Sequence, residues 1–113
     1  MKKLTAILLS LGIMMFSSAS NAEQFEGIEL PDDFQTSATL AGQYPAVLSG
    51  FLKMPIMSVL DYFKEGMGDP EFNEEQFSYY HLYYTVNEKK VRIIVSDQAE
   101  GWTQVDIMVM EQQ

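Results

Sequence analysis

Cysteine is absent from this chain, and its absence excludes several classes of protein. The 113 residues also include a single histidine and only seven basic side chains against sixteen acidic ones. Without cysteine the chain can form no disulfide, no thiolate metal site and no cysteine nucleophile. A small domain of this kind must be stabilised by its hydrophobic core alone, and 47% of its residues are hydrophobic.

Basic residues are too few and too scattered for a surface that binds nucleic acid. A duplex binder needs clustered cations, because its affinity depends on displacing the counterions of the phosphates. After residue 22 there are five basic residues, of which only Lys89, Lys90 and Arg92 lie close together. The composition therefore argues against binding of nucleic acid and of anionic membranes. It is typical of a soluble exported protein, with an acidic docking surface as the less favoured interpretation.

The N-terminal segment has the pattern of a secretory signal peptide. Lys2 and Lys3 form a basic start, residues 4–16 are apolar, and small side chains follow. We predict cleavage after Ala22, with Ala19 as the alternative position. The apolar run of 13 residues is shorter than the roughly 20 residues that a membrane-spanning helix needs, so a retained anchor is disfavoured.

Removal of this segment defines the expected mature protein. Residues 1–22 would be the signal peptide, residues 23–37 an acidic lead-in, and residues 38–113 a single small α+β domain. Loss of Lys2 and Lys3 leaves five basic against sixteen acidic side chains, a net charge of −11. We therefore expect a periplasmic protein without a membrane anchor.

One amphipathic helix is predicted to begin at Ser58. Ser58 and Asp61 have the spacing of a capping box, and Met57 is placed to pack on Tyr62. Apolar side chains recur on one helical face, at Val59, Leu60, Phe63 and Met67. The pattern ends at Gly66, Gly68 and Pro70. A helix of about ten residues is too short to be stable alone, so it must pack on another element.

Three C-terminal segments show the two-residue alternation of strands, at residues 77–86, 91–97 and 103–110. We predict an antiparallel meander whose first turn is the polar stretch 87–90. The expected opposite pairs are Val86 with Val91, Tyr84 with Ile93, and Leu82 with Val95. The third strand continues this apolar face with Val105, Ile107 and Val109. We expect the helix to cover this face.

The segment before the helix predicts a further hairpin. Residues 36–42 and 46–53 read as two short strands around Gln43-Tyr44-Pro45, because proline favours a turn and cannot donate to a ladder. The alanine and leucine content of these residues equally suits a short helix. The predicted fold class is thus α+β, with one short helix packed on an antiparallel β-meander that an N-terminal hairpin would extend.

The opposite face of the meander is the candidate functional surface. Strand alternation assigns to it seven candidate residues for binding a partner or ligand: Tyr79, His81, Tyr83, Ile94, Trp102, Met108 and Met110. A solvent-exposed face rarely collects so many aromatic and aliphatic side chains. Three interpretations stay open: residues 23–53 cover the face, a partner or second copy binds it, or a small ligand does. Arg92 and Asp106 share the face, where they are placed to form an ordinary ion pair.

Motifs for catalysis are absent from the sequence, and no catalytic or metal site is predicted. The chain has neither G-x-S-x-G nor H-E-x-x-H, and His81 has no second imidazole to work with. The acidic stretch 69–75 imitates the start of a calcium loop. Glu74 stands where such a loop needs glycine, however, and Tyr80 where it needs a bidentate glutamate. We therefore predict a solvated loop there.

The sequence favours a non-catalytic binding or interaction module that uses the aromatic sheet face, without a cofactor. Its partner would be a protein or a small ligand, and a homodimer is one form of this hypothesis. The alternative is a periplasmic copper carrier or small-ligand-binding protein. In that case thioethers would hold Cu(I), with His81 and four methionines as ligands: Met54, Met57, Met108 and Met110.

Overall fold

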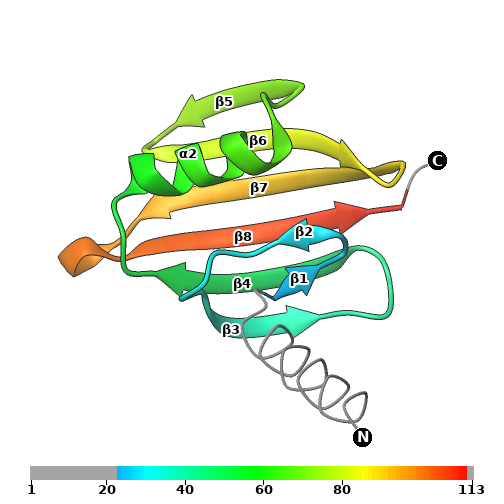
Figure 1. The fold of residues 1–113 in the computed structure, drawn as a ribbon, viewed down its shortest axis with the longest axis horizontal. Coiled ribbons are helices and arrows are strands. Elements are labelled where there is room, and N and C mark those ends of the chain that lie inside the picture. Colours follow the sequence, from blue (N-terminus) through cyan, green and yellow to red (C-terminus); the bar gives the residue numbers. More distant parts are fainter. Residues whose placement is uncertain (1–22, 112–113) are drawn as a thin grey trace, which may run out of the picture.

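A six-stranded antiparallel sheet forms most of the protein in the computed structural model, which describes residues 23–111 (Figure 1). Across the sheet the strands are β3 (Gln35–Leu40), β4 (Ala46–Leu52), β8 (Thr103–Met110), β7 (Lys89–Asp97), β6 (Tyr79–Val86) and β5 (Phe72–Gln76). The remaining elements are the helix α2 (Ile56–Met67), the small hairpin β1 (Gln24–Phe25) and β2 (Ile28–Glu29), and the 3-10 turn η1 (Ala99–Gly101). The predicted fold class, a helix packed on an antiparallel sheet, is confirmed.

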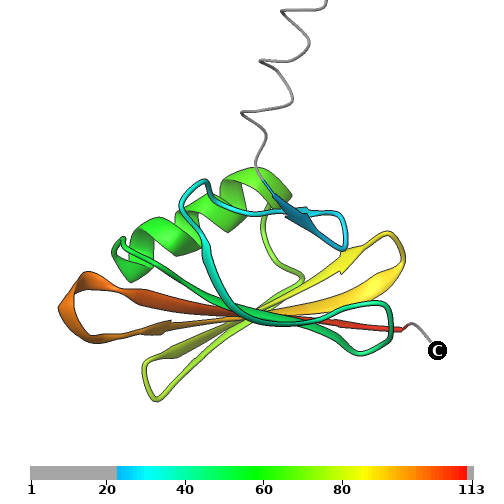
Figure 2. The ribbon, with the colours of Figure 1, turned by 90° about the horizontal axis from the view of Figure 1, so that it is seen from below.

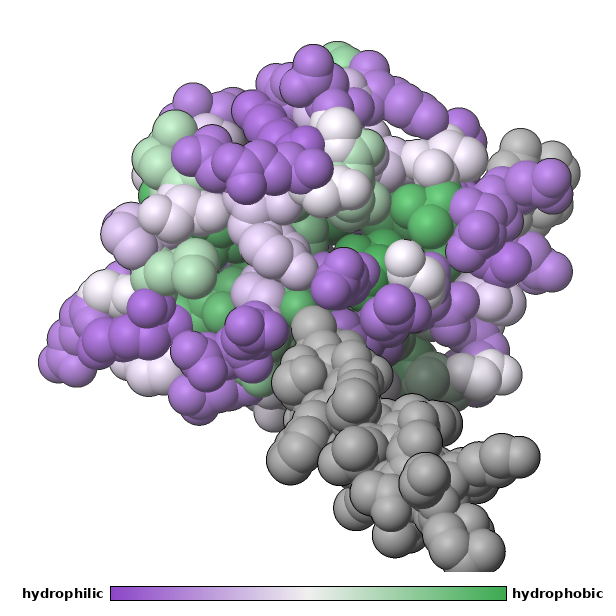
Figure 3. Space-filling view, viewed as in Figure 1, coloured by the Kyte–Doolittle hydropathy of each residue, from purple (hydrophilic) through white to green (hydrophobic). Residues whose placement is uncertain are grey.

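The elements form two layers. Figure 2 shows that α2 and the β1–β2 hairpin lie on the same side of the twisted sheet, and that no described element lies across the other side. On the covered side, hydrophilic residues dominate the surface, with apolar surface left between α2 and the hairpin (Figure 3). No helix of the described residues is long and apolar enough to span a membrane.

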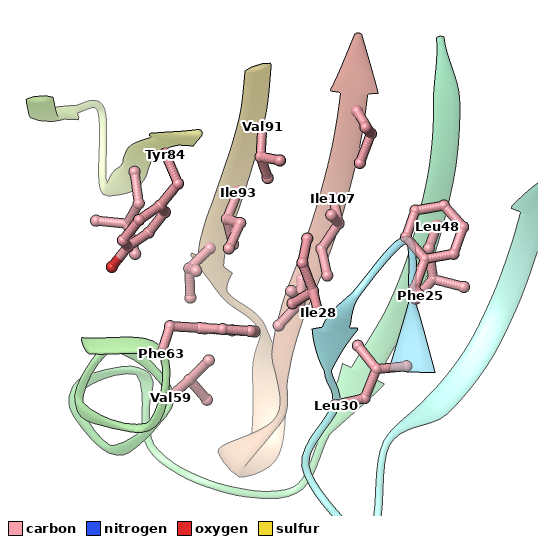
Figure 4. Close-up of a cluster of buried hydrophobic side chains, with 14 of the residues drawn as sticks. Phe25, Ile28, Leu30, Leu48, Val59, Phe63, Tyr84, Val91, Ile93 and Ile107 are labelled. Carbon is pink, nitrogen blue, oxygen red and sulfur yellow. The ribbon is translucent and has the colours of Figure 1, made fainter. Parts of the chain in front are cut away.

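The core lies between the sheet and this covering layer (Figure 4). The central strands contribute the apolar face predicted from their alternation, including Ile93, Val95, Val105 and Ile107, which are all fully buried. From α2 come Val59, Leu60 and Phe63, at most 4% exposed, so the predicted apolar stripe of the helix is confirmed for these three. The N-terminal segment adds Phe25, Ile28 and Leu30.

The register of β6 and β7 differs by two residues from the prediction. The observed pairs are Val86 with Lys89, Tyr84 with Val91, and Leu82 with Ile93. The turn contains only Asn87 and Glu88, both with positive φ, at 53° and 69°; this geometry matches the right-handed twist of a hairpin. The predicted pairs are therefore wrong, but a shift of two residues leaves every side chain on its predicted face.

The predicted capping box at Ser58 is also wrong. Helix α2 begins at Ile56, its N-cap is Pro55, and no side chain caps it. The amides of Ser58 and Val59 both donate to the carbonyl of Pro55, at 3.0 and 3.2 Å, which places Ser58 inside the first turn. Met57 is 58% exposed, so it does not pack on Tyr62 as expected.

The acidic stretch predicted as a loop forms the edge strand β5. Its backbone pairs with β6 from Phe72 opposite Tyr83 to Gln76 opposite Tyr79. Asparagine and glutamate have low strand propensity, but a neighbouring strand with free hydrogen-bonding groups overrides that preference. The prediction of a solvated loop over residues 69–75 is therefore wrong for residues 72–75.

The N-terminal half extends the structure in two ways. The predicted hairpin over residues 36–42 and 46–53 is confirmed as β3 and β4; β4 pairs with β8, and β3 forms the edge of the sheet. Residues 23–30 instead pack on the helix side. Gly27 has φ +85°, a left-handed conformation that favours glycine in this turn. The predicted signal peptide, residues 1–22, lies outside the described residues.

Candidate functional site

The sheet face opposite α2, called here the open face, is organised in rows that cross all six strands. One row contains Leu40, Val47, Met108, Arg92, Tyr83 and Phe72. The next contains Ala38, Ser49, Asp106, Ile94, His81 and Glu74, and a third contains Gln35, Phe51, Gln104, Ser96, Tyr79 and Gln76. Because neighbours in a row stand directly opposite each other, the central side chains shield one another and are half-buried.

The structure brings some of the predicted site residues together and separates others. His81 and Ile94 are direct neighbours, and Tyr83 lies two strands from Met108 with Arg92 between them. Trp102 and Met110 lie at opposite ends of β8. The ammonium group of Lys53 lies 5.2 Å from the Trp102 ring centroid. The candidate residues therefore share one face but do not form one cluster.

The charged groups of the open face are paired differently from the expectation. The guanidinium of Arg92 donates to the Tyr83 hydroxyl at 2.9 Å, and the Asp106 carboxylate accepts from the Gln104 amide at 3.2 Å. The expected Arg92–Asp106 pair is not formed. Among the described residues, two buried side-chain nitrogens lack a hydrogen-bond partner, His81 Nδ1 and Arg92 Nε. Both belong to the open face, so its hydrogen-bonding capacity is not fully met within the chain.

Sequence reasoning missed part of this surface. Val47 and Phe51 from β4 and Leu40 from β3 extend its apolar area, and Phe72 from β5 does so at the other edge. The alternation of residues 46–52 contained the signal for Val47 and Phe51, because their neighbours Ala46, Leu48 and Leu52 are the buried ones. Phe72 carried no such signal, since β5 is formed by pairing with β6.

The β5–β6 turn adds a shallow hollow to one edge of the open face. Gln76, Phe77, Tyr79 and His81 line a volume of ≈ 300 Å³. Phe77 is 86% exposed, and the two turn residues Phe77 and Ser78 have φ of 53° and 67°. Turns of this kind favour asparagine and glycine, so a phenylalanine here contradicts the local preference without adding buried surface.

A second concave region lies on the covered side, and the sequence did not predict it. This hairpin cleft, between the β1–β2 hairpin and α2, has a volume of ≈ 550 Å³ (Figure 3). The Tyr62 hydroxyl donates to the Glu29 carbonyl at 3.0 Å, and the Tyr84 hydroxyl donates to the Gly68 carbonyl at 2.8 Å. Burial raises the pKa of both phenols; Glu29 and Asp32 raise that of Tyr62 further, and Asp69 that of Tyr84.

The structure does not bring together the residues considered for metal binding. Met57 lies on α2, whereas Met108 and Met110 lie on β8 with side chains on the open face. In β5, Glu74 lies opposite His81 on the open face, while Glu75 alternates to the other side. Across residues 23–111, no three histidine or carboxylate side chains form a group able to hold a metal ion.

The chain has no match among protein-family models, curated proteins or solved structures. What the protein does can therefore be inferred only from its own surfaces.

Proposed function

We propose that the protein is an exported, non-catalytic binding module that engages a partner protein through the open face. The observation that carries this proposal is the group of half-buried apolar side chains on a sheet face that no described element covers. Val47, Phe51, Ile94 and Met108 lie in the middle of the face, and Leu40 and Phe72 extend the apolar surface to the two edges of the sheet. Apolar side chains interspersed with polar ones are typical of protein–protein interfaces. Export rests on the signal-peptide pattern of residues 1–22.

The size of the face favours a protein over a small ligand. Six strands with spacings of about 4.8 Å span roughly 24 Å, which is the scale of a standard interface that buries about 800 Å² on each partner. The hollow of ≈ 300 Å³ beside Phe77 lies at the edge of the face. A small ligand would leave most of the apolar surface uncovered.

Phe77 gives the proposal independent support. Its side chain is 86% exposed in a left-handed turn position, so it does not stabilise the isolated fold. Exposed aromatic residues are frequent anchors of protein interfaces, because they bury a large area in the partner. A partner that covers the β5–β6 end of the open face would account for phenylalanine at this position.

The test is site-specific photo-crosslinking with a matched control position. A photoreactive phenylalanine analogue is placed at Phe72, on the open face and 59% exposed, or at Met57, on α2 and 58% exposed. Because the two positions are equally accessible, random collisions label them equally. We expect irradiation of intact cells to give discrete crosslinked species from position 72 and few from position 57.

Mass spectrometry of the crosslinked species identifies the partner. A different protein, or a second copy of this chain, supports the proposal when it is captured at position 72 and not at position 57. Equal crosslinking from the two positions would contradict a binding role for the open face.

A further inference from the structure

The hairpin cleft is a second candidate binding site, on the opposite side of the sheet from the open face. Its floor is formed by the buried apolar side chains of Ile28, Phe63 and Tyr84, which come from three separate elements. Its volume of ≈ 550 Å³ falls within the range of small-molecule sites. Unlike the open face, this site is a concave space bounded by the hairpin, α2 and β6.

Gly66 is a glycine in the lining of the cleft at a position where a side chain would fit. It lines the cleft within α2, and a Cβ built at this position meets no atom within 4 Å. Neither crowding nor a left-handed backbone explains the glycine, although glycine destabilises a helix relative to alanine. A ligand that approaches the helix backbone explains the absence of a side chain here.

The charge of the lining points to a cation. Glu29 and Glu65 lie at the rim, and among the described lining residues none is basic. The direction of the tyrosine shifts is consistent with this, because Glu29, Asp32 and Asp69 all add to the raised pKa of Tyr62 or Tyr84. Tyr62 is the half-buried aromatic residue of a lining that also contains the carboxylates of Glu29 and Glu65, so the cleft offers a ring and negative charge, the two contacts that an organic cation prefers.

Two hydrogen bonds hold the walls of the cleft in place. Tyr62 connects α2 to the backbone of Glu29 in the hairpin, and Tyr84 connects β6 to Gly68 at the end of α2. Each phenol donates its hydrogen bond to a backbone carbonyl, and its oxygen can still accept one. The site is thus formed before any ligand arrives, which lowers the entropy lost on binding.

We propose that the hairpin cleft binds a free small organic cation with an apolar body, such as a quaternary ammonium compound. The apolar part would lie on the floor and beside Gly66, and the cationic part between Glu29 and Glu65. This proposal is independent of the open face, because the two surfaces lie on opposite sides of the sheet.

Three compounds of nearly equal shape test the charge requirement. Benzyltrimethylammonium is the cation, 2,2-dimethyl-3-phenylpropan-1-ol the neutral analogue, and 2,2-dimethyl-3-phenylpropanoate the anion. Titration of the purified protein by calorimetry and NMR should show the cation binding about tenfold more tightly than the alcohol, and the anion most weakly. Amide shifts should concentrate at Ile28, Tyr62, Gly66 and Tyr84, and added salt should weaken only the cation.

Variants then separate the charge from the shape of the site. Glu29→Gln and Glu65→Gln should each weaken the cation about two- to fivefold and leave the alcohol unchanged, because amides keep the shape but remove the charge. Gly66→Leu should weaken both compounds at least about tenfold, since its side chain fills the cleft. Gly66→Ala adds only a methyl group, so it should weaken both compounds less than Gly66→Leu does, while circular dichroism shows the fold retained in both variants.

Two results would overturn the proposal. Equal affinity for the cation and the alcohol would show that the carboxylates do not select the ligand. Unchanged affinity in Gly66→Leu, with the fold retained, would show that any binding occurs elsewhere.

Discussion

Tyr84 on β6 donates a hydrogen bond of 2.8 Å to the backbone carbonyl of Gly68, the C-cap residue that follows α2. The amide of Gly68 in turn donates to the carbonyl of Lys64 at 2.8 Å. The last turn of the helix is therefore connected directly to the sheet. Because a helix of 12 residues is marginal alone, this contact is one of those on which α2 depends.

Replacing this phenol should destabilise the protein measurably. We expect Tyr84→Phe to lower the free energy of unfolding by about 1 kcal/mol, the usual net value of one hydrogen bond. Urea denaturation followed by circular dichroism measures the change. Tyr79→Phe is the control, because Tyr79 is 49% exposed and its hydroxyl makes no hydrogen bond within the described residues; an equal loss in both variants would contradict the role of the Tyr84–Gly68 bond.

The same residue predicts how stability depends on alkaline pH. Burial, and then the charge of Asp69, raise the pKa of Tyr84 above its ordinary value of 10.0. The folded state therefore holds this proton more tightly than the unfolded state, so stability is full below about pH 10 and falls as pH rises through the folded pKa. Tyr62 acts in the same direction. Between about pH 8 and about pH 11, the free energy of unfolding should fall less in Tyr84→Phe than in the natural chain, as measured by denaturation at each pH. An identical fall in both proteins would contradict this linkage.

Ser58 should be replaceable, although its sequence position resembles a helix cap. Ser58 is exposed inside the first turn of α2, and its side chain caps nothing. We expect Ser58→Ala to change the unfolding free energy by less than about 0.5 kcal/mol. Thr103→Val is the contrasting change, because Thr103 is fully buried and donates to the Met54 carbonyl at 2.6 Å. That variant should lose about 1–3 kcal/mol, and the opposite ranking of the two in thermal melts would contradict this account of the helix start.

The β6–β7 turn offers a stabilising change. Glu88 has φ +69°, a conformation that is strained by about 1–2 kcal/mol for a residue with a Cβ and unstrained for glycine. We expect Glu88→Gly to raise the unfolding free energy by about 1 kcal/mol. Glu75→Gly removes the same charge from within β5 and should be destabilising instead. Stabilisation by both would assign the effect to lost negative charge and not to the turn.

The alternation of the central strands made the sheet predictable from sequence. Alternating buried side chains within each of β6, β7 and β8, mostly Val, Ile and Leu, identified one face, and a slip of two residues did not change it. The register depended on the turn at Asn87 and Glu88, where both residues have positive φ. The sequence did not indicate a two-residue turn there, because neither residue is glycine. The start of α2 was mispredicted because Ser58 and Asp61 have the spacing of a capping box. The helix instead begins after Pro55, whose carbonyl accepts the first hydrogen bonds of the helix although its side chain cannot cap.

The candidate sites were predictable only where they depend on strand parity. His81, Tyr83, Ile94 and Met108 lie on the open face for that reason. The hairpin cleft combines Ile28, Gly66 and Tyr84, residues separated by 18 or more positions, and no local pattern connects such residues. Phe77 shows a third case: residues 77 and 78 were predicted as the start of a strand but form a turn, so neither the turn nor the exposure of Phe77 was predicted.

Ile93 and Ile94 provide a direct comparison of the two faces, because they are adjacent in β7 and have identical side chains. Ile93 is fully buried under the helix layer, so Ile93→Ala should leave a cavity and cost about 2–5 kcal/mol. Ile94 is half-buried on the open face, and Ile94→Ala should cost about 1 kcal/mol or less.

The binding readout should show the reverse order for these two residues. Crosslinking from position 72 should fall strongly in Ile94→Ala, because an apolar residue at the centre of an interface contributes much of its binding energy. It should persist in Ile93→Ala at temperatures where that variant stays folded. Chemical denaturation supplies the stabilities against which the yields are compared. Equal destabilisation by the two changes would show that the open face is as buried as the core, and binding would then have to be assigned to another surface.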